Sequence, residues 1–272
     1  MQHHPWVRRI RLVQHTGTLG LVLAMILLGL RLGTSDTPVA VAGTLPGGSC
    51  ADLPGYDQLK AALVTARAAQ NGGFNLDMWG TIVNRDGVVC AVAFTGATRG
   101  DQWPGSRVIS AQKANTANAF SLPKLALSSA QLYTAVQPGG SLFGLQESNP
   151  VDVAAAYGGQ GDDYGQRTDP LVGKKIGGVN VFGGGLALYS ASGALLGALG
   201  VSGDTSCADH AIAWRTRNSL RLDYVPAGVS GDASRPDSIV YTAGSPWMHP
   251  HCLDADIETV IATALPPVPH AP

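Results

Sequence analysis

The stretch from Gly183 to Ala213 constrains the fold more than any other part of this sequence. Its apolar residues alternate on both sides of Ser192-Gly193, which predicts a β-hairpin, and Gly203-Asp204 then leads into a run typical of a helix. This order brings the start of a helix to the end of a sheet, where free backbone N–H groups favour an anionic group such as a carboxylate. The stretch therefore predicts a sheet with a binding position at its end.

A second hairpin and further helices are predicted from the preceding residues. Residues 78–84 and 88–95 read as two strands, and Asp86-Gly87 supplies the turn between them. Helices are expected over Tyr56–Gln70, residues 106–120 and residues 125–136. Two hairpins separated by helices predict an α+β fold, in which helices cover an antiparallel sheet.

Two segments depart from this pattern. Residues 146–178 are rich in Gly, Asp and Gln, which favours a solvated insertion. The alternative is a lid or binding loop, from which Tyr157, Tyr164 and Arg167 would reach over a ligand. We therefore expect a domain over residues 43–222 with this insertion, followed by a C-terminal extension over residues 223–272. The extension is expected to contain a strand at residues 238–241 and a helix at residues 254–264.

The first 42 residues are typical of an export signal. Arg8, Arg9 and Arg11 precede the apolar run Leu19–Leu30, and Ala40-Val41-Ala42 suits a signal peptidase. The apolar run is shorter than a membrane-spanning helix needs, so cleavage is favoured and an uncleaved anchor is the alternative. We therefore expect a periplasmic or secreted protein.

The charge of the chain argues against one class of partner. Residues 1–42 contain four Arg and one Asp, so their removal takes the formal net charge from −1 to −4. Recognition of nucleic acid requires a basic face, and nothing in this balance suggests such a partner.

Four cysteines follow the expected cleavage site, at Cys50, Cys90, Cys207 and Cys252. An oxidising compartment makes disulfides plausible, with three possible pairings. We favour Cys207 with Cys252, which would tie the extension to the start of the last core helix, and a free buried thiol is the alternative for Cys90. No Cys-x-x-Cys-His motif occurs, which excludes ordinary covalent attachment of a c-type haem.

The helix over residues 106–120 has a stripe that suits an amphiphilic ligand. The stripe is formed by Ile109, Lys113, Thr116 and Phe120, at spacings of four, three and four residues. A cation, a hydroxyl and two apolar groups suit a porphyrin, whose ring favours burial and whose carboxylates favour charge. The alternative is a solvated Lys113 with Thr116 packed against its neighbours.

The residues around the second hairpin have a binding and a structural interpretation. The candidate binding residues are Gly183, Gly184, Gly185, Ser202 and Gly203. Glycine allows a ligand close to the backbone, but a tight strand entry also requires it. Ser202 could bind a carboxylate, and helix capping by Ser202, Asp204 or Ser206 is the alternative.

The histidines are the candidate metal ligands. His210 stands beside Asp209, which could orient it, although a half-exposed helix histidine is the simpler interpretation. His249 and His251 form the better ligand cluster, but Pro250 between them lets their side chains diverge. The alternative for this pair is a structural loop.

Three separated segments together resemble a known family. They are residues 78–95, residues 106–120 with Lys113-Ala114-Asn115-Thr116-Ala117, and residues 183–213. Their order and spacing are similar to those of the small haem-binding proteins of the GlcG and HbpS type, which are related to the C-terminal domain of PduO-type proteins. The resemblance implies a profilin-like antiparallel sheet of about five strands flanked by helices. It also implies tetrapyrrole binding and a homo-oligomer.

The chain departs from that family at Ala187, where the family tends to have Pro. Some relatives are described as degrading haem or releasing its iron, but no proton shuttle or redox dithiol predicts catalysis here. Hydrolase, Rossmann and P-loop motifs are absent from the sequence.

The sequence thus predicts an exported protein that binds haem non-covalently, in haem sequestration, redox sensing or iron supply. One alternative is a periplasmic accessory subunit that binds a partner protein. Another is a metal-dependent enzyme built on His249 and His251.

Overall fold

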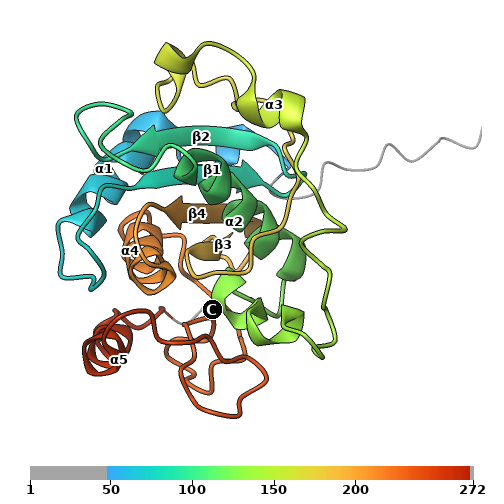
Figure 1. Cartoon of the computed structure of the whole chain (residues 1–272), viewed down its shortest axis with the longest axis vertical. Helices are drawn as coiled ribbons and strands as arrows, with labels where there is room; N and C mark the ends of the chain where they lie inside the picture. Colours follow the sequence, from blue (N-terminus) through green and yellow to red (C-terminus); the bar gives the residue numbers. More distant parts are fainter. Residues whose placement is uncertain (1–47, 270–272) are drawn as a thin grey trace, which may run out of the picture. The chain divides into compact units, whose positions relative to one another are not determined.

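A computed structural model describes residues 48–269, and within them the strands form one antiparallel sheet (Figure 1). The strand order is β2-β1-β4-β3. The bounds of the strands are Trp79–Asn84 for β1, Val89–Phe94 for β2, Gly185–Tyr189 for β3 and Leu195–Ser202 for β4. Pairing of β1 with β4 joins the two predicted hairpins, because Trp79 faces Ser202 and Asn84 faces Gly197.

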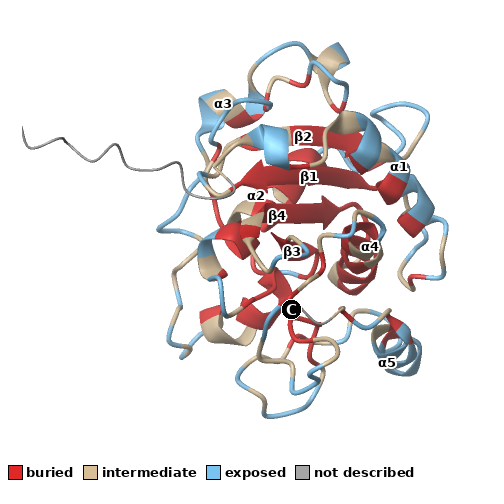
Figure 2. Cartoon of the chain, turned by 180° about the vertical axis from the view of Figure 1, so that it is seen from behind, coloured by how far each residue is buried: buried red, intermediate tan, exposed pale blue. Residues whose placement is uncertain are grey.

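Helices cover both faces of the sheet. The helix α2 (Ser106–Phe120) packs on β1 and β4 from one side, and α1 (Tyr56–Arg67) and α4 (Ser206–Ser219) pack on the other. The strands are buried almost throughout their length (Figure 2). Alternate side chains enter opposite cores, since Ile82 packs with the α1–α4 side and Val83 with the α2 side.

The α+β fold class is confirmed, and the sheet has four strands within residues 48–269 where the resemblance implied about five. Both sheet edges are bordered by irregular segments. Beside β3, the chain after α4 makes one isolated parallel bridge, between Tyr189 and Asp223. Beside β2, Gly173 and Lys174 exchange backbone hydrogen bonds with Val89. These segments cover the edges without extending the sheet.

Two predicted elements are wrong. Residues 125–136 form two short 3₁₀ helices, Ser129–Leu132 and Thr134–Val136, in place of one α-helix. The hydroxyl of Ser129 donates to the Phe182 carbonyl and accepts from the Gly185 N–H at 2.8 Å, so this segment is held by remote residues. Residues 238–241 form no strand, because the Ile239 N–H donates to His210 and the Val240 carbonyl accepts from the His249 N–H.

The insertion is anchored to the core and is not a solvated loop. It contains α3 (Val153–Tyr157) and a 3₁₀ turn at Gly161–Asp163. Leu171 and Ile176 are buried in the core beneath α2. Asp169 receives two hydrogen bonds from the buried guanidinium of Arg107, with Nε–Oδ2 at 2.9 Å.

The extension contains the predicted helix, α5 (Ala255–Ala264), which Asp254 caps at its N-terminus. Among the described residues, no helix combines the length and apolar character needed to cross a bilayer. The predicted export signal, its arginines and the anchor alternative lie outside residues 48–269, as does His270.

Two disulfides link the chain. The favoured bond between Cys207 and Cys252 is present, and it ties the extension to the start of α4. A second bond joins Cys50, at the start of a 3₁₀ turn over Cys50–Asp52, to Cys90 on β2. The alternative of a free thiol at Cys90 is therefore wrong.

Candidate functional site

A cavity of about 320 Å³ lies beside α2 and the start of α4, where β4 ends. We call it the α2–α4 cavity. Lys113 and Ser202, both predicted from the sequence, line it. The other lining residues are Trp103, Ser106, Ile109, Asn180, Phe182, Asp204, Ser206 and Asp209. The cavity thus has an apolar wall and a polar end.

The polar end is organised by a buried ion pair. Lys113 Nζ lies 2.7 Å from Asp209 Oδ2 and donates to the Val201 carbonyl at 3.2 Å, and both charged side chains are 2% exposed. Burial raises the pKa of Asp209 to about 6, although the Lys113 charge and hydrogen bonds from Lys113 and Asp204 oppose that rise. The alternative of a solvated Lys113 is wrong, because the lysine reaches across the end of the sheet to α4.

The predicted glycines lie where other parts of the chain approach the backbone closely. Gly184 has a φ of +118°, and a Cβ there would lie 2.3 Å from the Val201 oxygen and 3.2 Å from Lys113 Cδ. A Cβ on Gly183 would lie 2.2 Å from the Ser206 carbonyl oxygen, and one on Gly185 would lie 2.3 Å from that of Lys113. A Cβ on Gly203 would lie 2.3 Å from the Asp77 oxygen. Packing alone therefore requires small residues at these positions.

The start of α4 differs from the prediction. Thr205 is the N-cap and accepts from the Ala208 N–H at 3.2 Å, so the expected caps Ser202, Asp204 and Ser206 are wrong. The Asp204 carboxylate instead accepts from the Phe74 and Leu76 N–H groups.

The backbone N–H groups in the first turn of α4 also have hydrogen-bond partners. The Asp209 N–H donates to the Thr205 carbonyl, and the Cys207 N–H donates to Cys252 Sγ. The Ala208 N–H is taken by Thr205, so these three N–H groups all have partners within the protein. Of the donors predicted from the sequence, the Asp204 N–H donates to Asp209 Oδ1 at 2.9 Å.

The rest of the predicted stripe on α2 serves the wall of the cavity. Thr116 accepts from the Asn180 N–H at 2.9 Å and so positions a residue of the cavity lining. Phe120 lies one turn further on and packs with Val179 and Val181, away from that lining.

His249 reaches the edge of the cavity through Ser206. Its Nε2 lies 3.2 Å from Ser206 Oγ, and its Nδ1 lies 2.7 Å from the Pro250 carbonyl oxygen. A carbonyl only accepts, so Nδ1 carries the proton and Nε2 presents its lone pair to Ser206. Burial lowers the pKa of His249 to about 4, which keeps the ring neutral at pH 7. Tyr133 lies between this ring and Phe182, with ring centroids 5.1 and 6.1 Å away.

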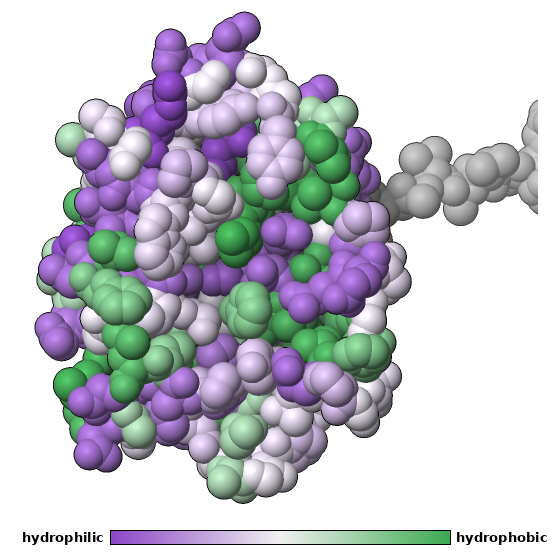
Figure 3. Space-filling model, in the orientation of Figure 1, coloured by the Kyte–Doolittle hydropathy of each residue, from purple (hydrophilic) through white to green (hydrophobic). Residues whose placement is uncertain are grey.

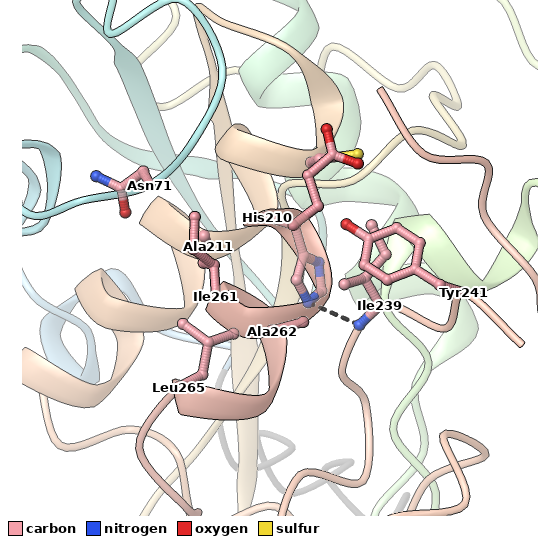
Figure 4. Close-up of a pocket in the computed structure, with 10 residues that line it drawn as sticks. Asn71, His210, Ala211, Ile239, Tyr241, Ile261, Ala262 and Leu265 are labelled. Atoms are coloured by element: carbon pink, nitrogen blue, oxygen red, sulfur yellow. Dashed lines mark hydrogen bonds between the residues drawn. The ribbon is translucent and has the colours of Figure 1, made fainter. Parts of the chain in front are cut away.

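The other two histidines point elsewhere. His251 contacts Glu258 at 3.0 Å and stacks on Tyr241, so it diverges from His249 as Pro250 led us to expect. His210 is fully buried, not half-exposed, and Asp209 pairs with Lys113 rather than orienting it. Its Nε2 accepts from the Ile239 N–H at 3.0 Å, as Figure 4 shows beside a small pocket. Burial lowers its pKa to about 3, and its Nδ1 has no hydrogen-bond partner among the described residues.

A second cavity, of about 360 Å³, lies on the other side of the start of α2, and we call it the aromatic cavity. Trp79, Tyr157 and Tyr164 line it, and Arg107 stacks 3.7 Å from the centre of the Tyr164 ring. Tyr157 and Tyr164 therefore border a cavity, as the lid alternative suggested. Arg167 lies apart from it and pairs with Asp57.

Sequence reasoning missed Asp209 and Ser206 as site residues. Asp209 stands 96 positions from Lys113, and nothing in the local pattern links the two. The favoured Cys207–Cys252 pairing carried a usable signal for Ser206, because it brings the histidine loop to the start of α4.

The fold and cavity define an α+β protein with one antiparallel sheet, helices on both faces and a cavity at the sheet end. The family model described as "HbpS-like, Haem degrading protein HbpS-like" matches residues 57–217, and the chain belongs to this family. The resemblance seen in the sequence is thereby confirmed.

Three solved structures are similar to the chain. Klebsiella pneumoniae protein ORFY is 24% identical over 63% of this chain and 89% of its own, with a TM-score of 0.42. A PduOC:haem complex is 25% identical over 61% and 91%, with a TM-score of 0.42. HbpS is 15% identical over 61% and 86%, with a TM-score of 0.38. Comparison with curated proteins finds no significant match.

Proposed function

We propose that this protein binds haem non-covalently in the α2–α4 cavity. Membership of the HbpS-like family supports the ligand, and the lining of the cavity supports the place. Trp103, Ile109 and Phe182 offer apolar surface to a flat macrocycle, and two of them are unusually exposed for their size, Trp103 at 51% and Phe182 at 40%.

The observation that carries the proposal is the state of His249. A neutral imidazole whose Nδ1–H is fixed by a carbonyl, and whose Nε2 is directed at the cavity edge, has the arrangement of a metal-ligating histidine. His249 is therefore the candidate iron ligand, with Ser206 as the group that it would leave. The bound haem would supply the redox chemistry of its iron, while this residue would set the ligand field.

The charges at the polar end of the cavity would determine the orientation of the haem. Lys113 is matched by Asp209, and Asp204 adds a second carboxylate to the same lining. This balance disfavours haem carboxylates there, so we propose that they point to solvent and that the apolar edge enters the cavity. The cavity volume of about 320 Å³ is smaller than a haem molecule, which agrees with partial burial.

Titration of the protein with haemin, followed at the Soret band, tests this function. We expect saturable, stoichiometric binding that His249→Ala weakens with a change of band position, while His251→Ala leaves both unchanged. Phe182→Ala should weaken binding, and Phe143→Ala, which removes a ring of 66% exposure outside the cavity lining, should not. No saturable shift would reject haem binding.

We further propose that the protein acts outside the cytoplasm as a homo-oligomer, in haem sequestration or supply. The predicted export signal supports the location, and mass spectrometry of the exported protein would test cleavage after Ala42. Light scattering would test the oligomer.

The accessory-subunit alternative predicts one broad docking patch. On the face shown in Figure 3, apolar side chains gather in several patches separated by hydrophilic ones. Failure of the haemin titration would favour this alternative.

A further inference from the structure

Three potential metal ligands meet at the start of α4. Cys207 Sγ, Cys252 Sγ and His249 Nε2 or Nδ1 offer ligand atoms that all lie within 4.8 Å of one another. The two sulfurs are joined in a disulfide, and Ser206 separates the cluster from the α2–α4 cavity. Two sulfurs and one imidazole nitrogen form a ligand set that zinc favours.

We propose that reduction of the Cys207–Cys252 disulfide creates a Zn²⁺ site formed by both cysteines and His249. A dithiol donor would transfer two electrons and two protons to the disulfide, giving two thiols here and a disulfide in the donor. Binding of Zn²⁺ then releases the two thiol protons. Three protein ligands leave a fourth position for the Ser206 hydroxyl or a water, on the side of the cavity, which is the pattern of an open zinc site.

The surroundings of the two sulfurs suit a negatively charged ligand atom. Cys207 is the second residue of α4, where the helix N-terminus stabilises negative charge. Cys252 Sγ accepts from the Cys207 N–H at 3.2 Å and lies 3.5 Å from Ser206 Oγ.

The imidazole is already prepared for a metal. The Pro250 carbonyl fixes the proton of His249 on Nδ1, and within residues 48–269 the hydrogen bond of Nε2 is to Ser206 alone. A hydrogen-bonded partner of this kind orients a histidine ligand.

Other bonds hold the ligand loop when the disulfide opens. The buried carboxylate of Glu258 accepts from the N–H groups of Cys252 and Leu253, at 2.9 and 2.8 Å for the nearest oxygens. The His249 N–H donates to the Val240 carbonyl at 2.8 Å. The loop therefore keeps its place after reduction, and the three ligands stay close.

Cobalt binding tests the proposal on the full chain without haem. All measurements use the variant Cys50→Ser/Cys90→Ser, in which a phosphine reductant can act only on the Cys207–Cys252 disulfide. We expect the reduced protein to bind one equivalent of Co²⁺ with a thiolate charge-transfer band, which Zn²⁺ displaces, and the oxidised protein to show no band. His249→Ala should lower the affinity by more than the roughly 100-fold that loss of a ligand's hydrogen-bond partner costs. The matched control His251→Ala should retain the Co²⁺ affinity of the reduced protein.

Three results would overturn the proposal. They are absence of the band in the reduced protein, equal affinity in His249→Ala and His251→Ala, and loss of the native circular dichroism spectrum on reduction. The last would show that the loop does not persist without the disulfide. Because no haem is present, none of these results depends on the haem proposal.

Discussion

At the scale of single residues, the Lys113–Asp209 pair dominates the account. It connects α2 to α4 across the end of the sheet, with both groups almost fully buried. A buried pair need not stabilise a protein more than apolar residues would, but removing one partner leaves a charge without compensation.

Lys113→Met should therefore lower the free energy of unfolding by about 3–5 kcal/mol at pH 8, as measured by urea denaturation. The cost should shrink at pH 5, because the Asp209 carboxyl, whose pKa burial already raises to about 6, becomes protonated and neutral. Arg167→Met removes the cation of an exposed pair with Asp57 and should cost much less, because solvent screens an exposed pair. A loss in Lys113→Met that is equal at both pH values would contradict this role.

Two buried histidines give a second prediction, on acid stability. The folded-state pKa values are about 4 for His249 and about 3 for His210, against 6.5 in the unfolded chain. Between pH 4 and 6.5 the unfolded state thus binds more protons at these sites, and stability falls as the pH falls. Asp209 acts in the opposite direction between pH 3.8 and 6, because its folded pKa is raised.

Summed over His249, His210 and Asp209, the unfolded state binds about one more proton than the folded state between pH 6 and 4. The free energy of unfolding should therefore fall by about 1.4 kcal/mol per pH unit as the pH falls. Urea unfolding over this range should show that slope in the unmodified protein. His249→Gln should nearly abolish it, since His210 and Asp209 then cancel. An unchanged slope in this variant would show that His249 is not held neutral.

At the scale of elements, the insertion over residues 146–178 differs most from what its sequence predicted. Its composition predicted solvation, yet Arg107 binds Asp169 with both groups buried, and Leu171 enters the core. The insertion is therefore part of the folded unit and forms one wall of the aromatic cavity through Tyr157 and Tyr164.

Arg107→Met should release this element selectively. Trypsin should then cut at Arg167, Lys174 or Lys175 much faster than in the unmodified protein, because Asp169 loses its buried partner. Arg99→Met is the matched control, since Arg99 pairs with the exposed Asp162. Equal cleavage rates in the two variants would mean that the ion pair does not hold the insertion.

Elements with local signals were predictable from the sequence. The Asp86-Gly87 and Ser192-Gly193 turns and the periodic helices have their causes within a few residues, and the structure contains them. Residues 125–136 and 238–241 were predicted wrongly because their hydrogen bonds go to remote residues, such as Phe182 and His210. The same holds for the lining of the α2–α4 cavity: Lys113 and Ser202 were singled out from the sequence, but their neighbour Asp209 was not a predicted site residue.

At the scale of the whole molecule, the extension reaches the edge of the candidate site. The Cys207–Cys252 bond and the His249–Ser206 contact bring a segment outside residues 57–217 to the cavity beside α2. The candidate iron ligand therefore comes from outside the part of the chain that the family model matches. We propose that a tetrapyrrole occupies this cavity and not the aromatic one.

The most direct measurement is a two-dimensional amide NMR spectrum of the protein with diamagnetic gallium protoporphyrin. We expect the largest changes in amide chemical shift around the α2–α4 cavity, at Ile109, Phe182, Ser206 and His249. Shifts confined to Trp79, Tyr157 and Tyr164 would place the ligand in the aromatic cavity and contradict the account.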